Sequence, residues 1–165
     1  MRVSTGLIPV TGFEIAFDTA VIVPASYMIV GNEVKAVLTG VVLPKLEAGG
    51  TRGYGFSGKL KIVAVSTCDK CLKEVKCNLK ADILEEFSKK NPDAWQIFND
   101  SIDFSEAVMA NTCALLPMKI LCKENCLGLC SICGKDLNEG LCCCEKPLDQ
   151  RFAVLSSFFN REPSE

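Results

Sequence analysis

The cysteines are the side chains of this 165-residue chain whose type and spacing could do chemistry. There are eleven cysteines and no histidine, and seven of the cysteines fall between residues 122 and 144. Thiolates are soft ligands that suit zinc and iron–sulfur clusters. Clustered cysteines in a reducing compartment indicate metal or redox chemistry more often than a disulfide framework, and an odd number cannot pair completely.

The strongest local pattern is CxxCG, formed by Cys130, Cys133 and Gly134. Three further cysteines follow at residues 142–144, after a stretch that contains turn residues. A short ribbon could therefore bring Cys130, Cys133, Cys142 and Cys144 around one tetrahedral zinc ion.

Two other pairs lack partners along the chain. Cys68 and Cys71 form a CxxC motif between two predicted strands, and the tip of a hairpin is a typical place for a zinc knuckle. Cys122 and Cys126 form the second pair. Together they predict a second four-cysteine site that joins the hairpin tip to the C-terminal segment. The alternative is one site drawn from residues 122–144, with Cys68 and Cys71 free.

The three remaining cysteines are not expected to bind metal. Cys77 and Cys113 fall on apolar faces, where a free cysteine behaves as a small hydrophobic residue. Cys143 is expected to point away from the ribbon.

Two enzymatic interpretations of the cysteines are disfavoured. Cys126, Cys130 and Cys133 match the CxxxCxxC pattern of radical S-adenosylmethionine enzymes, but the rest of the chain is too short for the barrel that should follow. A thioredoxin-like pair at Cys68 and Cys71 should begin a helix, whereas strands flank it here. Without histidine no Ser/His/Asp or Cys/His set is possible, and no phosphate-binding glycine motif is present. We therefore expect no enzyme activity.

The elements that must position the cysteines are mainly strands. Alternating or β-branched runs predict strands over residues 13–18, 33–45, 58–66 and 75–84, and the glycines of 47–58 predict a hairpin loop. Residues 88–100 are polar and predict a linker that Trp95 anchors by partial burial. Residues 103–116 predict a helix that begins at Asp103, with Glu106 three residues on, and ends before Pro117. Residues 152–159 predict a short final helix.

These elements predict an α+β fold. Its body is an antiparallel β-sheet or a partly open β-barrel with one or two helices, and a C-terminal cysteine-rich module resembles a zinc ribbon. The expected division is residues 1–117 for the body and 118–165 for the zinc-binding module.

Charge and hydropathy restrict the partners. The net charge of −2 gives no overall attraction to nucleic acid. No apolar run is long enough to span a bilayer, and the N-terminus lacks a secretory signal, so we expect a cytoplasmic protein without a membrane partner. A local excess of lysine is the candidate surface for RNA or an acidic partner, against the ordinary alternative of a solvated face. It consists of Lys59, Lys61, Lys70, Lys73, Lys76 and Lys80.

The cysteine motifs resemble those of the YceD family, also called domain of unknown function 177. The resemblance lies in CDKCL at residues 68–72, LPM at 116–118, and GLCSICGKDLNEG at 128–140 with the cysteines around it. It covers nearly the whole chain. The residues at 149–151 depart from it, since Gln150 stands where the family commonly has proline.

The resemblance implies a cytoplasmic bacterial protein that supports accumulation of large-subunit (23S) ribosomal RNA, and hence ribosome assembly, without enzyme activity. We therefore expect a non-catalytic factor holding one or two structural zinc ions. Its expected partner is a ribosomal assembly intermediate, through a protein or through ribosomal RNA, with no small-molecule substrate. The alternative is a redox or iron–sulfur protein that uses the clustered cysteines.

Overall fold

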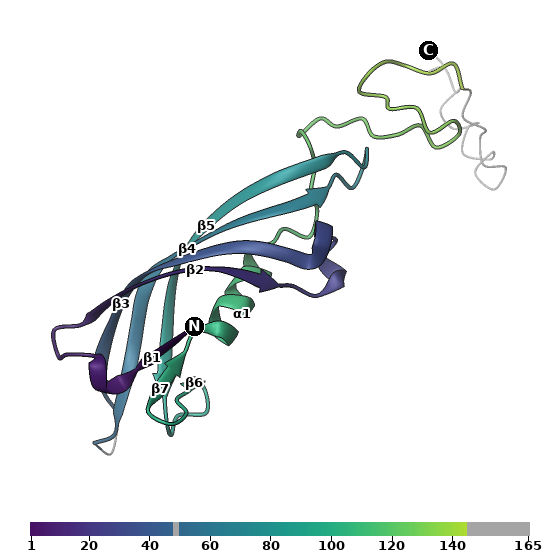
Figure 1. Cartoon of the computed structure of the whole chain (residues 1–165). Coiled ribbons are helices and arrows are strands. Elements are labelled where there is room, and N and C mark those ends of the chain that lie inside the picture. The colour runs from purple at the N-terminus through teal and green to yellow at the C-terminus, as the bar shows by residue number, and fades with distance from the viewer. Residues whose placement is uncertain (48–49, 145–165) are drawn as a thin grey trace, which may run out of the picture.

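A computed structural model describes residues 1–47 and 50–144. It consists mostly of long strands that form a curled sheet around a single α-helix (Figure 1). In chain order the main elements are β1 (Arg2–Ser4), β2 (Phe13–Ile22), β3 (Glu33–Leu46), β4 (Arg52–Thr67), β5 (Glu74–Ser88), β6 (Trp95–Gln96), β7 (Ser101–Asp103) and α1 (Ser105–Leu115). Short 3-10 turns lie at Thr5–Leu7, Ala25–Tyr27 and Val30–Asn32.

The main sheet has the strand order β2-β3-β4-β5-β6, and β1 pairs with β7 in a separate two-stranded sheet. All pairings are antiparallel except that of β5 with β6. Side chains alternate between the two faces, as in any strand. In β4, Leu60 and Ile62 are buried on the inner face, whereas Lys59 and Lys61 are exposed on the outer face. The predicted strands are thus present, and each is longer than its apolar pattern alone indicates.

The glycine-rich stretch is not the long loop that the sequence predicts. Only a short connection separates β3 from β4, and Gly53, Gly55 and Gly58 lie within β4. Gly40 and Gly58 pair directly across the strands, where a Cβ on Gly58 would lie 2.4 Å from the ring of Phe56. Gly40 and Gly58 thus permit close packing of β3 against β4, and a local turn rule does not predict this role.

The helix packs inside the curl and contacts β2, β3, β4 and β5. Phe104, just before α1, anchors it among three aromatic rings, with centroids 5.8 Å from Phe17, 5.3 Å from Phe56 and 4.8 Å from Phe87. Burying a side chain of this size contributes about 1.5–3 kcal/mol. The helix begins two residues later than predicted, because Asp103 is the last residue of β7 and Phe104 occupies the N-cap position. Asp103 still accepts a hydrogen bond from the Ser105 amide at 2.9 Å.

The expected β-rich body with one helix is confirmed. Trp95 is partly buried and donates its indole N–H to Glu85 at 2.6 Å. None of the helices in the described part of the chain is long and apolar enough to cross a membrane. The helix predicted at 152–159 lies outside the described residues, and the division at residue 117 stays a prediction.

Candidate metal centre

Four cysteines from two distant parts of the chain converge at the tip of the β4–β5 hairpin. Cys68 and Cys71 lie between the two strands, and Cys122 and Cys126 come from the coil after α1. We call these four residues the bridging cluster. The Cys68 and Cys126 sulfurs are 3.8 Å apart, and those of Cys71 and Cys122 are 3.5 Å apart. Cys68, Cys71 and Cys126 are buried, whereas Cys122 is exposed.

A second group of four cysteines lies further along the chain. Cys130, Cys133, Cys142 and Cys144 form what we call the C-terminal cluster. In both clusters the four sulfurs lie within 4.8 Å of one another. Cys143 belongs to neither cluster and is exposed, while Cys77 and Cys113 pack against the main core. The structure therefore brings the cysteines together in the two sets of four that the spacing predicts.

The distances fit a tetrahedral metal site. Four sulfurs about 2.3 Å from a central zinc ion have edges of about 3.8 Å. The sulfur–sulfur distances of 3.5 and 3.8 Å are close to this edge and far longer than a disulfide bond of about 2.05 Å. The donor set is all thiolate, which suits zinc or an iron–sulfur cluster. The bridging cluster could hold a metal without a large rearrangement, and identification of that metal as zinc stays a prediction.

The two CxxC turns share one backbone geometry. The amide of the first cysteine, Cys68 or Cys130, donates to the carbonyl five residues on at 2.8 Å. The amide four residues on donates back to the carbonyl of that cysteine at 2.9 Å. The residue after the second cysteine is left-handed in both turns, with φ of 60° at Leu72 and 72° at Gly134. Only glycine adopts this conformation without cost, so Leu72 is strained where Gly134 is not.

Charge repulsion within the clusters favours a bound cation. Burial raises the pKa of the Cys68 thiol, but hydrogen bonds from backbone amides, that of Cys71 first, lower it to about 6. Hydrogen bonding to Cys71 and then to Cys126 raises the pKa of Cys122 to about 12. The C-terminal cluster shows the same division between one lowered and one raised thiol pKa. Four thiols this close cannot all ionise without a cation among them.

The cysteine-rich segment has little other stabilisation of its own. Across residues 117–144 there is no helix or strand, and the one β-bridge pairs Leu129 with Asp136. The buried cysteines of the bridging cluster form a small apolar group separate from the main core. A segment that buries so little apolar surface typically needs a metal to hold its shape. The zinc-ribbon character expected for this segment stays a prediction.

Backbone contacts join the hairpin tip to the segment that follows. The Asp69 amide donates to the Ile120 carbonyl at 2.9 Å, and the Ile120 amide donates to the Asp69 carboxylate at 2.7 Å. The Leu129 amide donates to the Lys70 carbonyl at 3.1 Å. Gly128 has a φ of 78°, and a Cβ there would lie 3.0 Å from the Lys70 carbonyl oxygen. Glycine at this position therefore permits the close approach of the two segments.

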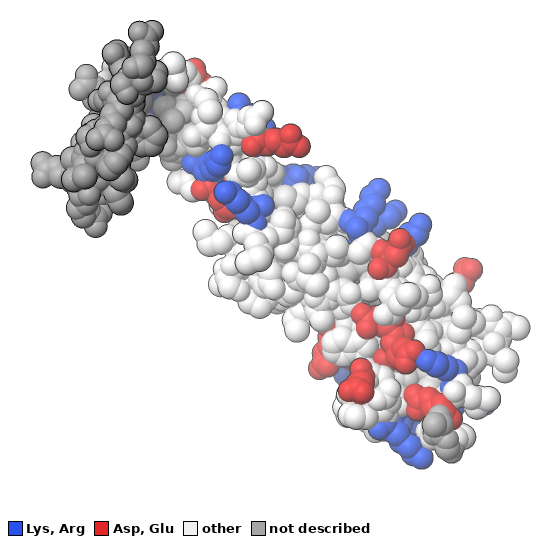
Figure 2. Space-filling view, turned by 180° about the vertical axis from the view of Figure 1, so that it is seen from behind, with Lys and Arg blue, Asp and Glu red and all other residues white. Residues whose placement is uncertain are grey.

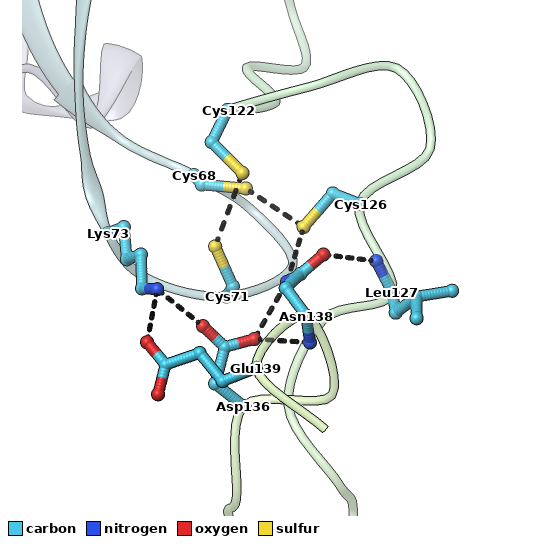
Figure 3. A network of polar contacts seen from close by, with 9 residues as sticks. All are labelled: Cys68, Cys71, Lys73, Cys122, Cys126, Leu127, Asp136, Asn138 and Glu139. Carbon is cyan, nitrogen blue, oxygen red and sulfur yellow. Dashed lines mark hydrogen bonds and ion pairs between the residues drawn. The ribbon is translucent and has the colours of Figure 1, made fainter. Parts of the chain in front are cut away.

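A polar network connects the loop of the C-terminal cluster to the bridging cluster (Figure 3). Asn138 donates from Nδ2 to the Cys126 sulfur at 3.4 Å, and its Oδ1 accepts from the Leu127 amide at 3.0 Å. Asp136 accepts from Asn138 Nδ2 at 2.7 Å and forms an ion pair with Lys73 at 2.8 Å. Lys73 also pairs with Glu139 at 2.7 Å.

Sequence reasoning missed this network. In the sequence, Asn138 falls in the turn-rich stretch before residues 142–144, and Gly128 begins the motif at 128–140. The available signal was their position: Gly128 stands between Cys126 of one predicted site and Cys130 of the other, and Asn138 lies in the loop between Cys133 and Cys142. A short polar residue there can reach a sulfur, and a glycine can allow segments to approach closely.

The six candidate lysines divide into two groups. Lys70 donates to the Cys126 carbonyl at 2.9 Å, and Lys73 is held by Asp136 and Glu139, so both belong to the cysteine-rich region. The other four are exposed on the outer face of the β4–β5 hairpin, at Lys59, Lys61, Lys76 and Lys80.

The four hairpin lysines form what we call the hairpin lysine face. Lys61 and Lys80 stand directly opposite each other across the strands, and Lys59 is opposite Asp82. These three lysines and Asp82 border a shallow hollow of about 220 Å³. In the view of Figure 2, basic side chains gather midway along the body, and acidic ones gather toward the end away from the cysteine-rich segment.

Comparison with known proteins identifies one family. The model of a family described as "Large ribosomal RNA subunit accumulation protein YceD" matches residues 56–159. The match covers most of the β4–β5 hairpin, the helix and both cysteine clusters. No curated protein and no solved structure matches the chain significantly.

Proposed function

The chain belongs to the YceD family, and on that premise we propose that it is a non-catalytic, zinc-stabilised factor that supports accumulation of large-subunit ribosomal RNA. Family membership implies the link to ribosomal RNA. The observation that carries the rest is the pair of four-cysteine clusters, each with its sulfurs within 4.8 Å of one another.

An all-thiolate site of four cysteines supports a structural role. A zinc ion with four protein ligands has no open position for water or substrate, so it fixes the fold and does not activate a reactant. In the bridging cluster, Cys68 and Cys71 would hold the hairpin tip, while Cys122 and Cys126 would hold the segment after α1. The metal would thus hold a coil-rich segment against the end of the sheet.

The hairpin lysine face is the surface that we propose for contact with RNA. Like charges directly opposite on a sheet face are destabilising, and Lys61 and Lys80 are in this position. No carboxylate in the described part of the chain forms an ion pair with either. An anionic partner would offset this repulsion, and a phosphate backbone supplies closely spaced charges.

The cellular role is tested by deleting the gene and measuring the ratio of large-subunit to small-subunit ribosomal RNA. We expect the ratio to fall and to be restored by the wild-type chain. A Cys68→Ser, Cys71→Ser double variant should fail to restore it. An unchanged ratio in the deletion strain would refute the proposed role.

Metal content separates this proposal from a redox or iron–sulfur function. Protein purified without added metal should be colourless and contain about two zinc ions per chain. A brown protein that contains iron and sulfide would support the iron–sulfur alternative instead.

The RNA surface is tested by the salt dependence of binding to large-subunit RNA. A Lys61→Gln, Lys80→Gln double variant should reduce the slope of log affinity against log salt by about 1 to 2, because each lost phosphate contact removes about 0.7 to 0.9. Lys90→Gln is the matched control, since Lys90 is exposed outside the hairpin lysine face. An unchanged slope in the double variant would mean that this face does not contact phosphate.

A further inference from the structure

We propose that Asn138 couples the two clusters, so that metal binding at the C-terminal cluster strengthens metal binding at the bridging cluster. The inference rests on the metal binding proposed above and adds a cooperative relation between the sites. It assigns Asn138 as a positioning residue, which acts on the bridging metal through the sulfur of Cys126.

The position of Asn138 depends on the C-terminal cluster. The residue lies in the loop between the two cysteine pairs of that cluster, after Cys133 and before Cys142. Closing the cluster brings the two ends of this loop together and limits the conformations open to Asn138. Without that closure, the loop must be ordered by its own few contacts.

The contact of Asn138 is made to the other cluster. Its Nδ2 lies 3.4 Å from the Cys126 sulfur, and its Oδ1 is 3.0 Å from the Leu127 amide. One side chain therefore fixes both the sulfur and the backbone that follows it. Cys126 is 1% exposed, so water has little access to replace the donor.

The orientation of the Asn138 amide is determined by its neighbours. Asp136 accepts from Asn138 Nδ2 at 2.7 Å and from the Asn138 backbone amide at 2.8 Å. Rotating the side-chain amide by 180° would place an oxygen against both the carboxylate of Asp136 and the sulfur of Cys126. A carboxylate and a thiolate can only accept hydrogen bonds, so the observed orientation is the only one that satisfies both.

Ion pairs hold the same loop against the other half of the bridging cluster. Lys73, at the hairpin tip, pairs with Asp136 at 2.8 Å and with Glu139 at 2.7 Å. The loop thus contacts the hairpin tip that carries Cys68 and Cys71, and also the segment that carries Cys126. Ordering of the loop consequently favours the arrangement in which the bridging sulfurs are already close together.

The sign of the coupling follows from charge. Four thiolates around a divalent ion carry a net charge of about −2. A hydrogen-bond donor to one sulfur stabilises that charge, and loss of such a partner typically lowers metal affinity by 10–100-fold. Because coupling between binding sites is reciprocal, metal at the bridging cluster must strengthen binding at the C-terminal cluster by the same factor.

The test is a zinc competition titration of the full, reduced, metal-free chain with a chromophoric chelator, read at the bridging cluster. A Cys142→Ser, Cys144→Ser double variant disables the C-terminal cluster, and Asn138→Ala removes the donor. We expect each change to lower the affinity of the bridging cluster for zinc by about tenfold. Their combination should lower this affinity no further than either change alone. A loss of about 100-fold in the combined variant, the product of two independent effects, would overturn the coupling. An unchanged zinc affinity in Asn138→Ala would overturn it as well.

Two further variants keep this test decisive. Asn125→Ala removes an exposed amide between Cys122 and Cys126 that forms no side-chain hydrogen bond within residues 1–47 and 50–144, so its affinity should equal that of the wild type. Asn138→Asp keeps the size and the acceptor for Leu127 but places a carboxylate oxygen against the sulfur. It should lose at least as much affinity as Asn138→Ala, and a wild-type affinity would overturn the coupling.

The outcome is distinguishable from a failure of the proposed function. Zinc bound at both clusters with independent affinities overturns only the coupling. A wild-type chain that binds no zinc overturns the coupling together with the structural metal. The affinities are measured on purified protein, so they do not depend on whether ribosomal RNA accumulates.

Discussion

Replacing Gly128 with alanine should weaken metal binding at the bridging cluster more than its small size implies. Gly128 has a φ of 78°, and its backbone passes close to Lys70 at the hairpin tip. An added Cβ would lie 3.0 Å from the Lys70 carbonyl oxygen and 3.3 Å from the Lys70 Cβ. Both contacts are tighter than ordinary van der Waals separations.

The expected cost has two parts. A left-handed conformation costs a residue with a Cβ about 1–2 kcal/mol. Relief of the contact with Lys70 would lengthen the hydrogen bond from the Leu129 amide to the Lys70 carbonyl, now 3.1 Å, at a cost of about 1 kcal/mol. The total of about 2–3 kcal/mol applies only while the two segments are together. It therefore corresponds to a loss of about 30- to 150-fold in affinity for the bridging metal.

Two other glycines provide matched controls for the zinc competition assay. Gly134 and Gly31 both have a φ of 72°, and an added Cβ would meet nothing within 4 Å at either. Gly134→Ala should show the backbone cost alone, at the C-terminal cluster, and Gly31→Ala should leave the zinc affinity unchanged. If Gly128→Ala binds zinc at the bridging cluster within threefold of the wild type, the proposed close approach to Lys70 is wrong.

Three further predictions concern strain, pH and metal removal. Leu72→Gly should raise the free energy of unfolding by about 1 kcal/mol, because it removes a left-handed side chain; a lower value in denaturant titrations would contradict this. Burial raises the pKa of Asp103, but hydrogen bonds from Ser105 outweigh it and hold that pKa well below its usual range. The ionised Asp103 should therefore stabilise the fold above about pH 4, and this contribution should be lost as the pH falls further. Asp103→Asn should lower the free energy of unfolding by about 1 kcal/mol at pH 7 and by less in acid. A loss that does not change with pH would argue against the lowered pKa of Asp103. Removal of metal by a chelator should leave the free energy of unfolding of the sheet unchanged, and trypsin should cut the chelated protein first after Lys119 or Lys123. Earlier cleavage within the strands would show that the body depends on the metal.

The strands were predictable because their side chains alternate between two environments. The inner positions of β4, such as Leu60 and Ile62, are apolar, and the outer positions Lys59 and Lys61 are charged. The extent of β4 was not predictable in this way. Gly53 and Gly55 resemble turn residues locally, and only their pairing with Lys45 and Leu43 of β3 shows that they belong to a strand.

The role of the lysines was only partly predictable. Sequence proximity grouped Lys70 and Lys73 with the lysines of the two strands. The hairpin tip instead turns Lys73 toward Asp136 and Glu139, which lie more than sixty residues away in sequence. No local pattern contains that information, since an ion pair depends on where distant loops meet.

By itself, the sequence determined the donor chemistry, an all-thiolate set with two CxxC turns, and it predicted two groups of four cysteines beside the alternative of a single site. Spacing carries that information because the reach of a CxxC turn is set by a few covalently linked residues. The structure brings Cys68 and Cys71 to Cys122 and Cys126. The tertiary structure alone decided that Asn138, from the loop of one cluster, donates to Cys126 in the other, and that Gly128 lies against Lys70. Those contacts depend on how the hairpin tip meets the C-terminal segment, and that arrangement is set by packing between parts of the chain far apart in sequence.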